Sequence, residues 1–149
     1  MQSKEHYFVP PNQPIEDIPD VIESLYLYGF SDYAKNELTL SGNSFPQLKS
    51  ITIGNYGFKN VREFVINGLS SLESVKIGNG CFTVDYGRND GVCRITNCPN
   101  LRQLEIGDRS FRDFQSFELS NLNSIQSIKF GDSCFKYANL SLKGEWNTL

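Results

Sequence analysis

A pattern of eleven residues occurs four times in this chain of 149 residues. The copies read LKSITIGNYGF, LESVKIGNGCF, LRQLEIGDRSF and IQSIKFGDSCF, and they start at Leu48, Leu72, Leu101 and Ile125. Successive starts lie 24, 29 and 24 residues apart. A period of this length is typical of a solenoid, in which each repeat forms one turn and stacks on the turn before it.

Each repeat contains two short stretches in which apolar and polar residues alternate, such as Ile51/Ile53 and Phe64/Ile66. Alternation with a period of two sends the apolar side chains to one face of a β-strand. A strand this short cannot bury that face alone, so neighbouring turns must supply the core. The sequence therefore predicts a mainly β fold, a right-handed solenoid of about five turns with two short strands per turn. The expected strand pairs are 25–28/38–41, 50–53/63–66, 74–77/93–96, 103–106/116–119 and 127–130/139–143.

The turn after each first strand has a fixed chemistry, because glycine is followed there by asparagine or aspartate. We expect the glycine to permit a positive φ angle and the Asn or Asp side chain to bond its own backbone. Phenylalanine stands three residues after each Asn or Asp. Equivalent positions of successive turns lie above one another, so these rings are expected to form a buried, stacked ladder. The glycines are Gly54, Gly78, Gly107 and Gly131, and the ladder residues are Phe58, Phe82, Phe111 and Phe135.

The chain divides into a tail, a cap and the regular repeats. Residues 1–14 are polar and Pro-rich, and we predict a flexible N-terminal tail. Residues 15–47 keep the apolar spacing in a degenerate form and are expected to be an N-terminal capping turn. Residues 48–149 are the regular repeats, the last of which is incomplete. An unfinished turn means either that the chain is a fragment or that this edge meets a partner, and such an edge favours edge-to-edge self-association.

Charge and hydropathy exclude several classes of protein. The net charge is −3, with 14 Lys and Arg interspersed among 17 Asp and Glu. We therefore expect no binding of nucleic acid, which requires a clustered basic face. The chain has neither the apolar core of a signal peptide near its start nor an apolar run of about 18 residues. We expect a cytoplasmic protein without a membrane span, or a cell-surface protein if a leader is missing from this fragment.

The cysteines do not form a recognisable metal or catalytic site. Cys81, Cys93, Cys98 and Cys134 include no CxxC pair, and the single histidine, His6, lies in the tail. We interpret all four as buried small apolar residues, with disulfides as the alternative. Cys93 and Cys98 occupy core positions of the repeat, whereas Cys81 and Cys134 lie two turns apart, too far for a disulfide. No catalytic motif is present, so we expect no enzyme activity, cofactor or metal.

The candidate binding residues lie on the outward positions of the first strands and in one inserted loop. The outward positions form a continuous face, and tyrosine is a frequent interface anchor. The face residues proposed for binding are Tyr26, Tyr28, Lys76, Glu105 and Lys129. The alternative is that the three charged residues merely pair along the sheet. The loop from Thr83 to Val92 contains the only insertion that lengthens the repeat period. Its candidate binding residues are Tyr86 and Arg88. Such a loop is either part of the binding face or a tolerated insertion.

The repeats resemble the leucine-rich-repeat superfamily, and within it the BspA-type repeats. The residues that carry the resemblance are the L-x-x-I-x-I pattern and the following Phe, whereas glycine stands where that branch commonly has proline. The stretch PNQPIEDIPDVIESLYLYGF is similar to the FNIP repeat of microbial eukaryotes. The resemblance implies a recognition scaffold that binds another protein through variable surface residues. The alternative is a segment of a surface-displayed, adhesin-like repeat protein.

Overall fold

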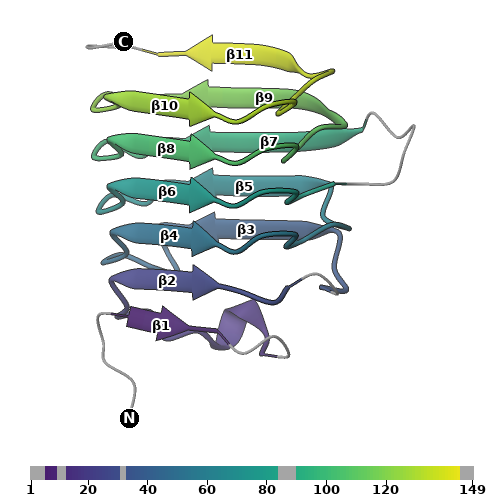
Figure 1. Cartoon of the computed structure of the whole chain (residues 1–149). Coiled ribbons are helices and arrows are strands. Elements are labelled where there is room, and N and C mark those ends of the chain that lie inside the picture. The colour runs from purple at the N-terminus through teal and green to yellow at the C-terminus, as the bar shows by residue number, and fades with distance from the viewer. Residues whose placement is uncertain (1–5, 10–12, 31–32, 84–89, 145–149) are drawn as a thin grey trace.

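The computed structural model describes residues 6–9, 13–30, 33–83 and 90–144. The chain is a β-solenoid of about five turns, with 40% of the described residues in strands. Figure 1 shows the turns stacked along one axis, and the described residues contain no α-helix, only a 3-10 turn at Ile15–Asp17. The predicted fold, a repeat solenoid with two short strands per turn, is confirmed.

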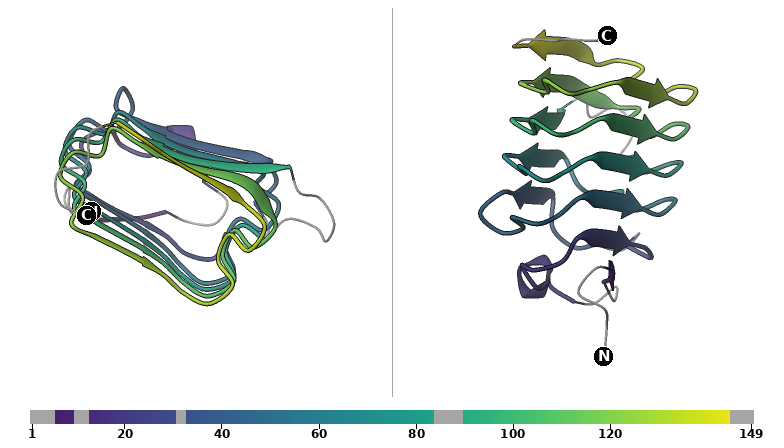
Figure 2. Two further views of the ribbon diagram at one scale, coloured as in Figure 1. Left: turned by 90° about the horizontal axis from the view of Figure 1, so that it is seen from above. Right: turned by 90° about the vertical axis from the view of Figure 1, so that its left-hand side faces the viewer.

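Two parallel sheets form opposite walls of the solenoid, as the view along its axis in Figure 2 shows. The structure places each predicted strand within two residues of its expected bounds. Sheet A has the order β1-β2-β4-β6-β8-β10, and sheet B has the order β11-β9-β7-β5-β3. The strands of sheet A are β1 (His6–Phe8), β2 (Ser24–Leu27), β4 (Ser50–Ile53), β6 (Ser74–Ile77), β8 (Gln103–Ile106) and β10 (Ser127–Phe130). Those of sheet B are β3 (Glu37–Ser41), β5 (Glu63–Asn67), β7 (Gly91–Thr96), β9 (Phe114–Ser120) and β11 (Asn139–Lys143).

Strand β1 lies in the segment that the sequence analysis assigned to a flexible tail. His6–Phe8 pairs in parallel with β2, and the Val9 amide donates to the Tyr26 carbonyl at 3.1 Å. The physical reason is burial, because Val9 packs into the core with an exposed fraction of 4%. The solenoid therefore begins earlier than expected, with a strand in sheet A that has no counterpart in sheet B among the described residues.

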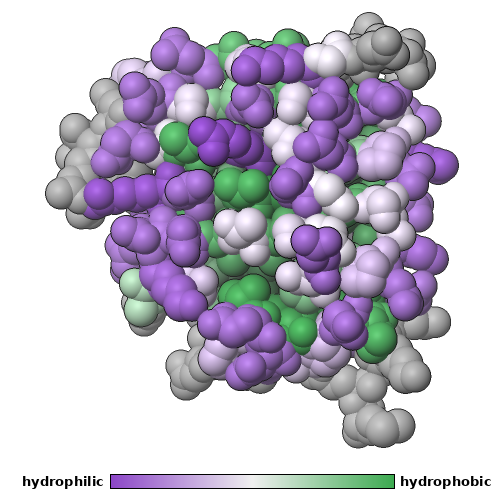
Figure 3. All heavy atoms as spheres, turned by 180° about the vertical axis from the view of Figure 1, so that it is seen from behind, coloured by the Kyte–Doolittle hydropathy of each residue, from purple (hydrophilic) through white to green (hydrophobic). Residues whose placement is uncertain are grey.

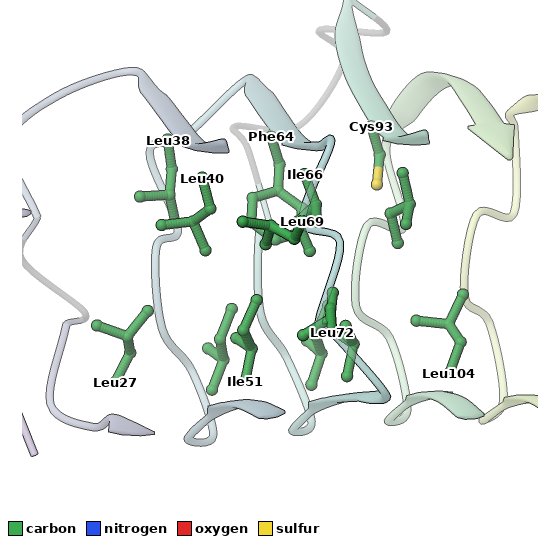
Figure 4. Packing of buried hydrophobic residues seen from close by; sticks show 14 of the residues in the cluster. Leu27, Leu38, Leu40, Ile51, Phe64, Ile66, Leu69, Leu72, Cys93 and Leu104 are labelled. Carbon is green, nitrogen blue, oxygen red and sulfur yellow. The ribbon is translucent and has the colours of Figure 1, made fainter. Parts of the chain in front are cut away.

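The core lies between the two sheets and is filled by the inward residues of both. Figure 4 shows leucine and isoleucine side chains from one wall pointing toward those of the other. The predicted phenylalanine ladder is confirmed, and Phe30 of the capping turn extends it. Successive ring centroids lie 5.1, 5.5, 4.5 and 4.8 Å apart, and each pair is stacked. The ladder is Phe30, Phe58, Phe82, Phe111 and Phe135.

The glycines after the first strands serve a different purpose from the one expected. The positive φ angles of this turn belong instead to the second residue after each glycine and to the ladder phenylalanine, for example Tyr56 at 61° and Phe58 at 57°. The glycines provide space. A Cβ added to Gly78 would clash with the side-chain oxygen of Asn55 and would come within 2.9 Å of its backbone nitrogen. Asn55 belongs to the preceding turn, so the absent side chain lets adjacent turns approach closely.

The Asn and Asp side chains of these turns also bond differently from the expectation. Asn55, Asn79 and Asp108 each accept the backbone amide of the equivalent residue in the next turn, not an amide of their own turn. The amides of Asn79, Asp108 and Asp132 donate to the side-chain oxygens of Asn55, Asn79 and Asp108 at 2.9, 2.8 and 2.8 Å. We call this series the Asx ladder. It satisfies turn amides that the strand pairing leaves open.

The four cysteines are free thiols in positions that the repeat dictates. Cys93 lies in register between Phe64 and Phe117 and is fully buried, as predicted, and Cys98 is buried too. Cys81 is also buried, whereas Cys134 is only half-buried. The Cys81 thiol donates to the Gly54 carbonyl at 3.1 Å, so this residue contributes a weak hydrogen bond as well as apolar volume.

The last described turn leaves apolar side chains exposed. Leu140 and Leu142 of β11 are 59% and 51% exposed, whereas their register partners in β9, Phe117 and Leu119, are each 1% exposed. β10 and β11 are the edge strands of the two sheets at this end. Within the described residues, therefore, the final turn presents its inward face uncovered.

Candidate binding surface

The outer face of sheet A is the surface on which the sequence analysis placed its candidate residues, and we call it the sheet A face. It is turned toward the viewer in Figure 1. Strand register aligns one outward residue from each strand in a single row. This row contains Phe8, Tyr26, Thr52, Lys76, Glu105 and Lys129. Three of the predicted face residues, together with Tyr26, are thus brought onto one continuous surface.

Aromatic side chains gather at the N-terminal end of this face. The rings of Phe8 and Tyr26 stack with centroids 4.3 Å apart and planes inclined by 9°. Tyr28 lies 6.2 Å from both of these rings, and His6 lies 6.1 Å from Tyr26. Phe8 and Tyr28 remain 53% and 46% exposed, which is high for large aromatic residues in a sheet. We call these four residues the aromatic cluster.

Tyr28 is held in place by the glycine of the following turn. It follows β2 directly, where it occupies the position that Gly54 occupies after β4. A Cβ on Gly54 would clash with Cδ1 of the Tyr28 ring and would come within 3.1 Å of Cε1. The ring therefore lies flat against the backbone at Gly54. This packing fixes the orientation of the ring while one side stays open to solvent, as an interface anchor requires.

The charged residues of the face form an alternating series. Lys76 is in register with Glu105, which is in register with Lys129, and all three are exposed. Among the described residues, no ion pair within 4.0 Å involves any of them. The series therefore presents charges of alternating sign to solvent, where they can pair with groups on a partner.

The predicted loop residues Tyr86 and Arg88 lie outside the described residues. The base of the loop is described, and there Asp90 forms an ion pair with Arg62 at 3.5 Å. Both partners are partly exposed, so this pair contributes at most about 1 kcal/mol to stability.

The sequence analysis missed His6 and Phe8, which complete the aromatic cluster. The sequence pattern that identifies them covers only a short stretch. The stretch HYFV has the same alternation as SLYL in β2, with Tyr7 and Val9 turned inward and His6 and Phe8 turned outward. A stretch of this length, followed directly by two prolines, carries too little periodicity to be separated from a tail.

The sheet A face presents its aromatic rings and charges on one parallel sheet. The described strands of this sheet are paired on both sides, except β1 and β10 at its ends. In the described part of the chain, no three His, Cys, Asp or Glu residues are grouped so that they could hold a metal ion. No described helix has the length and apolar character needed to cross a membrane.

Comparison with known proteins found no matching family model, no matching curated protein and no matching solved structure.

Proposed function

We propose that this protein is an interaction scaffold that binds a protein partner through the sheet A face. The observation that carries the proposal is the aromatic cluster. Phe8, Tyr26 and Tyr28 are stacked on one another, and Phe8 and Tyr28 are nevertheless exposed. Exposed aromatic residues on a rigid surface bind at a low cost in conformational entropy and are enriched in the energetically dominant parts of interfaces.

The rest of the face supports the same proposal. The alternating charges of Lys76, Glu105 and Lys129 would give the partner orientation and specificity. The resemblance of the repeats to leucine-rich repeats of the BspA type points the same way, because that superfamily serves for recognition.

Photo-crosslinking from two matched positions tests the proposal. A benzoylphenylalanine replaces Thr52 at the centre of the sheet A face or Val65 at the centre of the outer face of sheet B, two positions of similar, partial burial. In extract of the native cell, the proposal predicts a discrete adduct from position 52 that excess unlabelled protein suppresses, and none from position 65. Equal adducts from both positions, or an adduct that the unlabelled protein does not suppress, would contradict it.

A second proposal concerns self-association through the edge strands β10 and β11. Leu140 and Leu142 are exposed, and no described strand pairs with the outer edge of β10 or β11. Both features favour strand-to-strand pairing with another copy. Sedimentation equilibrium should then show a dimer that the double substitution Leu140→Lys and Leu142→Lys converts to a monomer. A monomer before substitution would contradict this proposal without affecting that for the sheet A face.

A further inference from the structure

A groove borders the N-terminal edge of sheet B. β3 is the first strand of that sheet, and no described strand pairs with it on the side away from β5. Sheet A extends further at this end, because β1 pairs with β2. The groove therefore lies where one more strand of sheet B would continue the wall. Its other side is the segment that contains the 3-10 turn Ile15–Asp17.

The hydrogen bonds between β3 and β5 determine which residues of β3 face the groove. The Asn36 carbonyl accepts the Glu63 amide at 3.2 Å, and the Gly42 amide donates to the Asn67 carbonyl at 3.0 Å. In a parallel pair, alternate residues turn both backbone groups to the same neighbour. Even-numbered residues of β3 consequently face β5, and odd-numbered residues face the groove.

Thr39 is the odd-numbered residue at the centre of β3, and both of its backbone groups are open. The Ser41 carbonyl is engaged by the Ser44 amide at 3.0 Å, and the Glu37 carbonyl lies 3.4 Å from the Tyr33 hydroxyl. Among the described residues, none hydrogen-bonds to the Thr39 amide or carbonyl from the groove side. An open amide and carbonyl on one edge residue are the template for adding a strand.

The groove has the size that an extended peptide needs. Its volume is about 560 Å³, and its accessible lining is mainly polar. Of its apolar lining residues, Ile18, Leu38 and Phe45 are buried, and Ile15 is partly exposed. The five residues of β3 extend over about 16 Å at 3.3 Å per residue, so a strand of similar length fits beside them. Figure 3, which views the molecule from the side of sheet B, shows apolar surface between polar side chains near the N-terminal end at the bottom.

The rim of the groove carries an excess of negative charge. Its charged residues are Glu16, Asp20, Lys35 and Glu37. Lys35 is already paired with Glu16 at 3.3 Å. Asp20 and Glu37 are exposed, and within the described residues neither forms an ion pair. A positively charged side chain on a bound peptide could therefore form an ion pair with either of these carboxylates.

We propose that this groove binds an extended peptide segment of a partner protein that adds a strand to β3 and carries Lys or Arg. The backbone of Thr39 provides main-chain hydrogen bonds, and the partly exposed Ile15 offers an apolar contact to a side chain of the peptide. Asp20 and Glu37 select the positive charge. This site is independent of the sheet A face, and neither proposal requires the other.

Hydrogen exchange with the probe peptide acetyl-KVTVK-amide tests the inference. In the free protein the Thr39 amide should exchange rapidly, whereas the Leu38 and Leu40 amides, which face β5, should be protected. At a peptide concentration about ten times the Kd, exchange at Thr39 should slow about tenfold, in proportion to the free fraction of the protein. The Leu38 and Leu40 amides should change little.

Two control peptides separate strand addition from other binding. A copy that is N-methylated at its central residues keeps every side chain but cannot pair with β3, and it should bind at least about tenfold more weakly. The peptide acetyl-EVTVE-amide should also bind more weakly, because it meets like charge at Asp20 and Glu37. Both controls leave the protein unchanged, so they stay informative if a protein variant fails to fold.

The variant Thr39→Pro removes the open amide from an edge position where proline is tolerated. It should weaken binding of acetyl-KVTVK-amide by about fivefold to tenfold, which corresponds to the loss of one backbone hydrogen bond. Three results would overturn the inference: no slowing at Thr39 in the saturated complex, equal binding of the N-methylated peptide, or protection of Thr39 that rises with protein concentration alone. The last result would assign the edge to a second copy of the chain.

Discussion

The side-chain oxygen of Asn55 accepts the backbone amide of Asn79, the equivalent residue one turn further along the solenoid, at 2.9 Å. Gly78, which precedes Asn79, leaves the space through which this bond passes, because a Cβ there would clash with that same oxygen. The Asx ladder and the column of glycines therefore depend on each other. A turn that carried a side chain at the glycine position could not stack at the spacing that the ladder requires.

Substitutions in the Asx ladder and in the column of glycines should separate the contribution of the hydrogen bonds to stability from that of the close packing. Asn55→Ala removes one hydrogen bond at an exposed site and should lower the free energy of unfolding by about 1 kcal/mol. Gly107→Ala should cost more, about 2–3 kcal/mol, because its Cβ would lie 2.7 Å from the Gly78 carbonyl carbon, and backbone cannot move aside as a side chain can. Urea denaturation measures the free energy of unfolding of both variants. Asn43→Ala, an exposed substitution outside the ladder, is the control and should have almost no effect.

The phenylalanine ladder should be most sensitive at its centre. Phe82 and Phe111 are fully buried, and their centroids are 4.5 Å apart. Replacing either by alanine should lower the free energy of unfolding by about 3–5 kcal/mol. Phe135 is only partly buried, so Phe135→Ala should cost less. Equal, small losses at all three positions in denaturant melts would show that the rings do not form a cooperative ladder.

The thiols should differ in reactivity according to their burial. Burial raises the pKa of Cys93 well above its usual value and also raises the pKa of Cys134, which is less buried. Only the thiolate reacts, so iodoacetamide at pH 8 should label Cys134 first and Cys93 only after unfolding. The unfolded thiols ionise at a lower pH than the folded ones, so stability should fall as the pH rises above about 8.5. Rapid labelling of Cys93 in the native protein, followed by peptide mass spectrometry, would contradict the assigned burial.

The repeat itself was predictable, because its physical signals are local and recur. Alternation located the strands, and the registry of the phenylalanines predicted their stacking. Cys93 could be assigned to the core because it occupies the position of Phe64 and Phe117. In each case several turns carry the same information, so one irregular copy does not hide it.

The contacts between turns were not predictable from one turn at a time. The role of Gly78 depends on Asn55 in the preceding turn, and residue type alone suggested a positive φ angle instead. The short strand β1 was missed since it has three residues and no repeated copy. The groove beside β3 depends on the absence of a neighbouring strand, which no sequence pattern records.

The affinity of two double variants for the partner identified by crosslinking tests the central claim most directly. Phe8→Ser with Tyr28→Ser removes two exposed rings of the aromatic cluster, and Tyr56→Ser with Tyr137→Ser removes two exposed rings outside the sheet A face. The first pair should weaken binding by at least about tenfold, which corresponds to about 1.4 kcal/mol. The second pair should leave binding unchanged, and both should retain a cooperative thermal transition. If the first pair binds normally, or if the second pair weakens binding as much, the aromatic cluster is not the binding surface.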